Sequence, residues 1–408
     1  MSEWLTDHEI LDFLKGQHLD VRVSRNGRWI DQKCTPDVLT VVADCIVQYL
    51  DRSGAEPFTS RDIWLDEYAS RYVPAMFKKP NLDNERAKHE YDKFFQQPMK
   101  LLAYAGVLHE DKISARNYYT ITNQELLVFI ARSEQTALDF LCSFINVVLV
   151  ASGLSAPFDK FLEEGTREAF DDLKDSFRDF TIRNTPINTA VECGRIFTKV
   201  LNPQAYRRNQ VGTERGTLSK DIISRDMLMY NRPNFRDTRT GKPRAVPRSL
   251  HTYTVSERAL VAYESQKAKR VVRNYNDAFN AGMSEVVPDG NTATQVHHIF
   301  PQSQFPSIAR YFENLVALTP NQHFQLAHPD NDTTRIDRRF QRRCLLMKLR
   351  AVRDTTASPD ANAIYDFKRF LEVLSVGLDD PAFLEMSEPG VVKAKIDEIY
   401  LGNGVVDD

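Results

Sequence analysis

The chain has 408 residues, 42% hydrophobic and 10% aromatic, which suits two or three folded units with real cores and excludes wholesale disorder. Its 53 basic and 56 acidic residues give a net charge of −3, which excludes a chain that coats nucleic acid through bulk charge. Five scattered cysteines form no C-x-x-C pair and argue against a disulfide framework. The N-terminus has no apolar core, and the apolar stretch 140–154 is short and contains polar residues. We therefore expect a soluble cytoplasmic protein in which this stretch is a buried helix.

The first folded region is predicted to consist of helices followed by a hairpin. Thr35 and Gly54 mark the start and end of one helix, and a second follows Ser60. A third helix is expected to break or kink at Pro98. Residues 106–122 then predict two short strands joined by a polar turn.

Three helices followed by a β-hairpin resemble a winged helix. We therefore predict a winged-helix-like DNA-recognition domain over residues 35–130, after an N-terminal extension over residues 1–34. Arg86, Lys88 and Lys93 would face DNA from its third helix, or would simply form a solvated helix face.

The middle of the chain changes from acidic to basic. Residues 131–190 are helical in pattern and increasingly acidic, which predicts a helical connector. Residues 205–248 then carry eleven basic and four acidic residues, interleaved with aromatic, Gly and Pro residues. Such a segment can follow a phosphate backbone, although the same composition suits a solvated surface loop. Within it, the residues predicted to bind DNA are Arg207, Arg208, Arg215, Lys220, Arg232 and Arg236.

A second basic run lies nearer the C-terminus. Residues 334–353 contain eight basic residues opposed only by Asp337, and we expect Arg338 and Arg342 to contact DNA. Residues 356–408 are predicted to form a helical, acidic tail that does not touch DNA.

Four of the nine histidines gather in one short segment, which even spacing along the chain would not produce. They are His297, His298, His323 and His328. Residues 294–299 and 315–318 predict two short strands with a loop between them.

The helix that follows the second strand has a well-marked start. Thr319 and Gln322 form a T-x-x-Q capping box, and Pro320 stands at the first helical position. His323 is therefore expected on the first turn. Strand, loop, strand and helix should bring the His297-His298 pair and His323 to a common point.

These residues resemble a known motif. HHIFP, then ENL, then LTPNQH are similar in type, order and spacing to the HNH, or ββα-metal, endonuclease motif. The resemblance covers residues 294–329 and implies a nuclease domain within residues 191–355. It implies that His297 is the first metal ligand, His298 the general base, Asn314 the residue that orients the base, and His323 the second metal ligand. Many HNH domains also bind a structural zinc through two C-x-x-C pairs, but Thr319 and Gln322 stand where one pair would be, so no structural zinc is expected.

The residue types suit phosphodiester hydrolysis. The attacking water needs a proton acceptor near pH 7, and the unperturbed pKa of imidazole is about 6.5. Two imidazoles can hold one divalent ion, Mg²⁺ or Mn²⁺, and leave positions for phosphate oxygens and water. The alternative is that His297 and His298 belong to a structural metal site or are satisfied core histidines. His328 lies about 140° from His323 around a regular helix, so it either contacts the scissile phosphate from the helix end or is a surface histidine.

Together these features predict a mainly α fold with small β elements (α+β), with winged-helix-like, connector and C-terminal HNH parts in chain order. The expected function is a divalent-metal-dependent endonuclease acting on double-stranded DNA, similar to HNH-type restriction enzymes, including those that recognise modified bases. The alternatives are an anti-phage effector or toxin nuclease with weak sequence preference, and a DNA-binding regulator with an inactive HNH core. One active site per chain makes a homodimer the natural arrangement for cutting both strands, and no membrane is expected.

Overall fold

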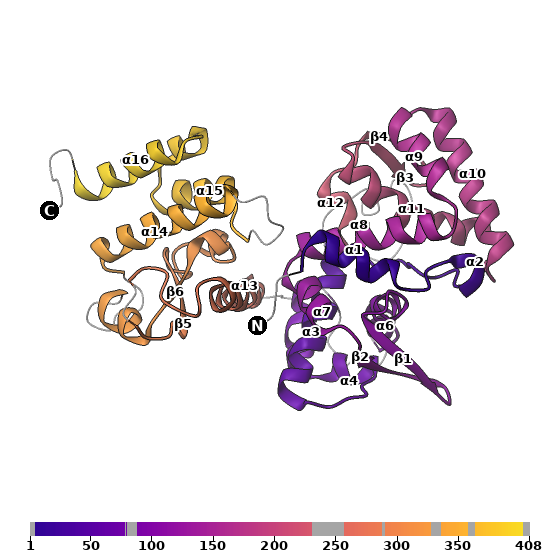
Figure 1. Ribbon diagram of the computed structural model, residues 1–408, viewed down its shortest axis with the longest axis horizontal. Helices are drawn as coiled ribbons and strands as arrows, with labels where there is room; N and C mark the ends of the chain where they lie inside the picture. Colours follow the sequence, from indigo (N-terminus) through magenta and orange to yellow (C-terminus); the bar gives the residue numbers. More distant parts are fainter. Residues whose placement is uncertain are drawn as a thin grey trace, which may run out of the picture. The chain divides into compact units, whose positions relative to one another are not determined.

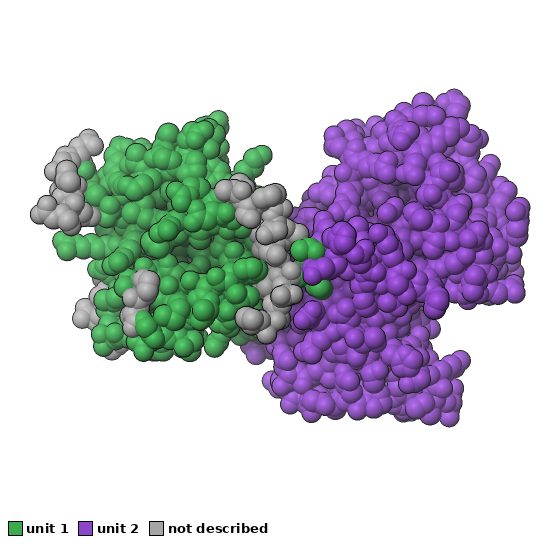
Figure 2. Space-filling view, in the orientation of Figure 1, with its two compact units in different colours: residues 1–6, 256–408 green, residues 7–255 purple. Residues whose placement is uncertain are grey.

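The computed structural model describes residues 5–77, 79, 88–230, 257–287, 290–327, 336–357 and 364–402. Within these residues the fold is mainly helical with small antiparallel sheets, as predicted. The same residues form three sheets of two strands each, and the one formed by residues 211–222 was not predicted, because that segment was expected to be loop-rich. The chain divides into two compact units (Figure 2): an N-terminal unit of residues 7–255 and a C-terminal unit of residues 256–408 with residues 1–6. The predicted nuclease region 191–355 crosses this division, so its basic first part belongs to the N-terminal unit.

The N-terminal unit begins with helices and a hairpin. Its first elements are α1 (Asp7–Lys15), α2 (Val21–Ser24), α3 (Pro36–Ser53), α4 (Ser60–Leu65), α5 (Glu67–Phe77), α6 (Lys88–Tyr104), β1 (Leu108–Ile113) and β2 (Arg116–Ile121) (Figure 1). Helix α3 starts after Thr35 and ends at Gly54, whose φ of 58° is the left-handed conformation that glycine adopts easily. The predicted hairpin is confirmed, because β1 and β2 pair antiparallel.

A single residue outside the hairpin pairs with its second strand through the backbone. Phe58, in the connection between α3 and α4, forms an antiparallel bridge with Tyr119 of β2. The Phe58 N–H donates to the Tyr119 carbonyl at 3.0 Å, and the Tyr119 N–H donates to the Phe58 carbonyl at 2.7 Å. The connection that leads into α4 is thereby held against the hairpin.

Helix α6 continues through Pro98, so the break expected there is wrong. Proline removes one backbone donor and would ordinarily interrupt a helix. Here the residues on both sides, including Phe94, Phe95 and Leu102, are fully buried, and this packed face holds the helix together across the missing hydrogen bond.

The second half of the N-terminal unit contains α7 (Gln124–Arg132), α8 (Glu134–Ala151), α9 (Ser155–Glu164), α10 (Arg167–Asn184), α11 (Ala190–Arg207), β3 (Val211–Glu214), β4 (Thr217–Ile222) and α12 (Arg225–Leu228). The predicted helical connector is confirmed as helical. Helix α8 is long and apolar enough to cross a membrane by length and composition alone, but 61% of it is buried inside the fold, as in a core helix. Asn202 of α11 fixes the hairpin, because its Nδ2 donates to the Thr213 carbonyl at 3.0 Å and its Oδ1 accepts from the Thr213 N–H at 2.9 Å.

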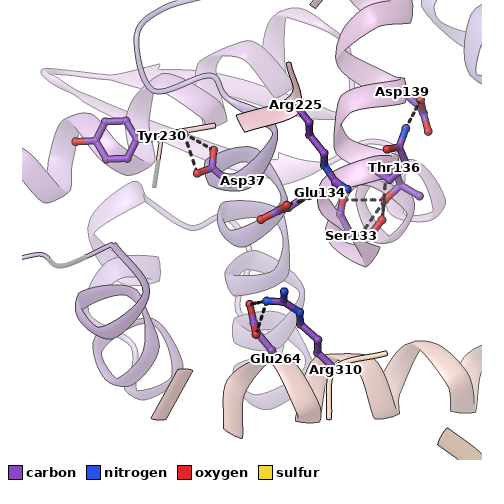
Figure 3. A network of polar contacts seen from close by, with 10 residues as sticks. Asp37, Ser133, Glu134, Thr136, Asp139, Arg225, Tyr230, Glu264 and Arg310 are labelled. Atoms are coloured by element: carbon purple, nitrogen blue, oxygen red, sulfur yellow. Dashed lines mark hydrogen bonds and ion pairs between the residues drawn. The ribbon is translucent and has the colours of Figure 1, made fainter. Parts of the chain in front are cut away.

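The described part of this unit ends at Tyr230, which is firmly anchored. Its backbone N–H donates to the Asp37 carboxylate at 2.8 Å (Figure 3), and Lys33 donates to its hydroxyl at 2.6 Å. Lys33 and Lys79 are buried and both pair with Glu90 at the start of α6. Although burial opposes ionisation of Glu90, the two lysines lower its pKa to about 2. These contacts fix Tyr230 against α3 and α6.

The C-terminal unit surrounds one small sheet with helices. Its elements are α13 (Glu257–Phe279), β5 (Gln295–His298), η3 (Pro306–Ile308), η4 (Phe312–Asn314), β6 (Leu315–Leu318), η5 (Gln322–Ala327), α14 (Arg338–Ala357), α15 (Phe367–Gly377), η7 (Pro381–Glu385) and α16 (Pro389–Leu401). Helix α13 packs against β5 and β6, and α14 packs against α15 and α16 (Figure 1). One hydrophobic core joins these layers, with Val272, Leu318 and Leu345 among its buried members.

A buried ion pair ties α14 to the sheet. Lys348 donates to Glu285 Oε1 at 2.8 Å, and the Tyr365 hydroxyl donates to the same oxygen at 3.0 Å. Glu285 Oε2 accepts from the Ala317 N–H of β6 at 2.6 Å. Because this ion pair is buried, removing either charged side chain would leave the other charge buried and uncompensated.

Glu313, in η4, is a buried carboxyl group that predicts a pH-dependent stability. Its Oε1 accepts from the Asp366 N–H at 2.7 Å, whereas its buried Oε2 has no hydrogen-bond partner among the described residues. Burial raises its pKa from 4.5 to about 7. The contribution of Glu313 to the free energy of unfolding is therefore fully present below pH 4.5, where its carboxyl group is protonated. This contribution is lost as the pH rises through 7.

Glu313→Gln keeps the acceptor for Asp366 and removes the charge. We expect the free energy of unfolding of the variant to exceed that of the wild type by about 3 kcal/mol at pH 9 and by much less at pH 5. Denaturant unfolding at both pH values measures this, with the exposed Glu385→Gln as the control. Equal differences at pH 5 and pH 9 would show that Glu313 does not titrate in this range.

Candidate active site

The histidine segment folds as strand, loop, strand and helical turn. Strands β5 and β6 pair antiparallel, with His297 opposite Val316 and His298 opposite Leu315. The helical turn that follows β6 begins as predicted, because Thr319 Oγ1 accepts from the Gln322 N–H at 3.4 Å. From Gln322 the turn is π-helical, a wider form often found at functional sites.

The side chain of Gln322 serves a different purpose from the one predicted. In a capping box it would reach back to the start of its own helix. Its Oε1 instead accepts from the Ser284 hydroxyl at 2.5 Å, and its Nε2 donates to the Val287 carbonyl at 2.7 Å. This amide therefore ties the helical turn to the segment before β5. The tie supplies part of the support that a structural zinc would give.

His297 and His323 lie side by side. Their ring centroids are 5.2 Å apart with an angle of 77° between the ring planes. Strand β5 supplies His297, and the turn after β6 supplies His323, whose N–H donates to the Thr319 carbonyl at 3.0 Å. The two residues that we expected to share a metal ion are thus brought together by the β5–β6 pairing and by the helix start at Thr319.

His298 is buried and held through one ring nitrogen. Its Nε2 lies 3.0 Å from the Ala309 carbonyl and 3.2 Å from the Ser265 hydroxyl. Because a carbonyl oxygen can only accept, Nε2 carries the proton, and Nδ1 is the basic nitrogen. Burial, followed by the charge of Lys269, lowers the pKa of His298 to about 4, so the imidazole is neutral at pH 7.

Asn314 acts on the loop between the strands. Its Nδ2 donates to the carbonyls of Phe300 and Ile308, at 3.1 and 3.3 Å, and its Oδ1 accepts from the Phe300 N–H at 2.9 Å. Ile308 is the neighbour of Ala309, whose carbonyl holds His298. These contacts are with the loop and not with the His298 imidazole, so the prediction that Asn314 orients the base stays a prediction.

Helix α13 also contacts His298. Its Ser265 hydroxyl donates to Gln302 Oε1 at 3.1 Å and can therefore accept from His298 Nε2. Its Glu264 pairs with Arg310 through both carboxylate oxygens, each at 3.1 Å (Figure 3). The loop is thus fixed to α13 next to Ala309.

The histidines open onto a cavity of about 310 Å³. Its lining residues are Lys269, His297, His298, Pro301, Gln302, Ser303 and His323. The sequence analysis did not identify Lys269 or Ser265, which lie one helical turn apart on α13. The face that they share with the buried Ala268 and Val272 is the signal that could have indicated them.

The two imidazoles fit a single metal ion. Their ring centroids, 5.2 Å apart, are close enough for one divalent ion to be bound by a nitrogen atom of each ring. The atoms Nε2 of His297 and Nδ1 of His323 are buried at this place. The described residues contain no group of three His, Cys, Asp or Glu side chains that could hold a metal, so water and substrate would supply the other ligands.

The remaining predicted contacts have varied surroundings. His328, Arg232 and Arg236 lie outside the described residues, as does Arg86. Arg207 lies within 4.0 Å of the carboxylates of Asp7 and Asp139, and Arg208 pairs with Asp159 at 2.9 Å. Arg215 and Lys220 are exposed on the hairpin of β3 and β4.

Two arginines of α14 hold α16 in place. Arg342 Nε donates to Asp397 at 2.9 Å, and Arg338 donates to the Ile399 carbonyl at 2.8 Å with its guanidinium over the Tyr400 ring. These contacts explain both residues without a nucleic acid. Their contact with DNA stays a prediction.

Helix α6 presents a polar, basic face. His89, Lys93, Gln96 and Lys100 are all exposed, and their spacing of three or four residues places them in one stripe. The two carboxylates of the helix have partners elsewhere: Glu90 binds Lys33 and Lys79, and Asp92 accepts from Trp64 Nε1 at 3.1 Å. The stripe therefore carries only hydrogen-bonding and positive groups.

Comparisons with known proteins found no match for this chain. No protein-family model matches the chain, no curated protein is significantly similar to it, and no solved structure matches its fold.

Proposed function

We propose that the chain is a divalent-metal-dependent endonuclease of the HNH type that hydrolyses double-stranded DNA. The observation that carries the proposal is the convergence of His297, His298 and His323 on one cavity, with Nδ1 of His298 unprotonated. A plasmid-cleavage assay with and without Mg²⁺ or Mn²⁺ tests it directly. Two imidazole ligands favour Mn²⁺, because Mg²⁺ prefers oxygen ligands.

In the proposed reaction, His298 accepts a proton from the attacking water at Nδ1. The water oxygen forms a bond to phosphorus, the bond between phosphorus and the 3′ oxygen breaks, and the leaving oxygen takes a proton from solvent. His298 then returns its proton to solvent. The metal ion held by His297 and His323 would supply positive charge to the phosphate oxygens. The Ala309 carbonyl keeps the imidazole in its productive tautomer, and Asn314 holds the adjoining loop through the Ile308 carbonyl.

We further propose that the region around α3 to β2 is a winged-helix-like reader of DNA. The order of helices, the Phe58–Tyr119 bridge and the hairpin support this assignment. The exposed stripe on α6 is suited to the major groove, where all four base pairs differ in their hydrogen-bonding groups. A reader joined to a cutting unit suits a restriction enzyme, and a homodimer would place two cutting units on the two strands.

The reader assignment predicts a specific change in salt dependence. We expect Lys93→Ala with Lys100→Ala, in the full-length protein, to reduce the slope of log K against log salt by about 2, because each phosphate contact contributes about 0.9. The control is Arg167→Ala with Arg178→Ala, which removes the same charge from the acidic helix α10. A slope equal to that of the wild type would assign the α6 stripe to solvent.

Sequencing the ends produced from plasmids of differing base modification distinguishes the remaining possibilities. Defined ends support a restriction enzyme, and ends that depend on modification support a modification-dependent one. Random ends support an effector or toxin nuclease, and binding without any cleavage supports a regulator.

A further inference from the structure

Lys269 occupies an unusual position for a lysine. It projects from the middle of α13 and lines the cavity formed by His297, His298 and His323. Burial lowers the pKa of its ammonium group, and among the described residues no carboxylate opposes that effect. A partly buried cation without a counter-ion is costly, and α13 has exposed positions such as Arg273 where a positive side chain meets water.

The cavity as a whole lacks negative charge. Its lining consists of one lysine, three histidines, a glutamine, a serine and a proline, all within the described part of the chain. A divalent ion bound by His297 and His323 would add two further positive charges that no lining carboxylate offsets. The lining of the cavity therefore suits an anionic ligand.

We propose that Lys269 holds the phosphate group of the scissile diester in this cavity, and that it does so without the metal ion. The inference rests on the proposed function, and it names the substrate-binding residue that the histidine motif itself lacks. An ammonium group is a compact point charge suited to phosphate oxygens. Helix α13 places it one turn from Ser265, so the residue that holds the base and the residue that holds the phosphate share one rigid element.

The test compares three variants of the full-length protein: Lys269→Met, Lys269→Arg and, as the matched control, Lys267→Met. Lys267 lies on the same helix, near the Tyr263 ring, and does not line the cavity. Bis(p-nitrophenyl) phosphate is used as the diester because it is too small to contact the winged-helix-like region as well. We expect Lys269→Met to raise KM for this diester about 10-fold or more, with a smaller change in kcat, since a charged hydrogen bond is worth about that factor. Lys269→Arg should recover most of the loss, and Lys267→Met should match the wild type.

A second measurement does not depend on turnover. Inorganic phosphate is titrated in chelator and followed by the amide NMR shifts of α13, and Lys269→Met should weaken its binding about 10-fold or more. If the wild type cleaves DNA while Lys269→Met keeps both its KM and its phosphate affinity, this inference is overturned and the nuclease proposal survives. If the wild type cleaves nothing but binds phosphate through Lys269, the anion site stands and the nuclease proposal fails. Phosphate binding through Lys269 that the diester does not compete with would identify free phosphate as the ligand and overturn the diester assignment.

Discussion

Replacing His298 by alanine is expected to abolish DNA cleavage and to leave DNA binding almost unchanged. General-base catalysis contributes about 10²- to 10⁴-fold to a rate, and the other two lining imidazoles, His297 and His323, are proposed to hold the metal ion. The contacts that we propose for DNA lie elsewhere, on α6 and at Lys269. Single-turnover cleavage and equilibrium binding in chelator measure the two effects separately.

The control for this prediction is the exposed His18→Ala, which should cleave at the wild-type rate. Added imidazole provides a further arm, because a small base that enters the cavity left by the side chain should restore part of the activity of His298→Ala. Cleavage by His298→Ala at a rate near that of the wild type would remove the basis for the HNH assignment. Loss of both binding and the unfolding transition would show that His298 is a structural residue.

The histidine site was predictable because its information is local. Two short strands, the loop between them and the next helical turn lie within about 35 consecutive residues, and turn and capping chemistry act over such distances. Thr319 and Pro320 mark the helix start from the sequence alone, and this start places His323 beside His297. Local signals therefore sufficed to bring together the three residues of the motif.

Lys269 and Ser265 were not predictable in the same way, because they reach the site through tertiary packing. They lie on α13, about 30 residues before the motif, and only the packing of α13 against β5 and β6 brings them to the cavity. A helical periodicity indicates which residues share a face, but not which strand that face will cover.

Charge density along the sequence does not show which cations pair with carboxylates in the fold. The basic segment from residue 205 and the basic helix α14 were the densest positive stretches, yet Arg208 and Arg342 pair with Asp159 and Asp397, which lie about 50 residues away in sequence. The exposed stripe on α6 has fewer charges, but the two carboxylates of that helix are bound to residues of other segments. The distribution of partners, which depends on the fold, decides which cations are available to a ligand.

Replacing His323 by alanine is expected to abolish cleavage by a different route from His298→Ala, through loss of the metal ion. A ligand that binds only the folded state raises its stability, by about 2.7 kcal/mol when its concentration is 100 times Kd. Mn²⁺ should therefore raise the thermal unfolding midpoint of the C-terminal unit in the wild type and in His298→Ala. The same addition should have little effect on His323→Ala and His297→Ala, because each lacks one of the two imidazoles.

This pattern separates the two roles within one cavity. His298→Ala and His323→Ala should be equally inactive, yet only His298→Ala should keep the Mn²⁺-dependent rise, which a general loss of folding cannot mimic. Because Lys269 and the phosphate bind without the metal ion, His323→Ala should also retain its affinity for inorganic phosphate in chelator. If His323→Ala kept the Mn²⁺-dependent rise, the ion would have to bind elsewhere, and the side-by-side packing of His297 and His323 would be structural.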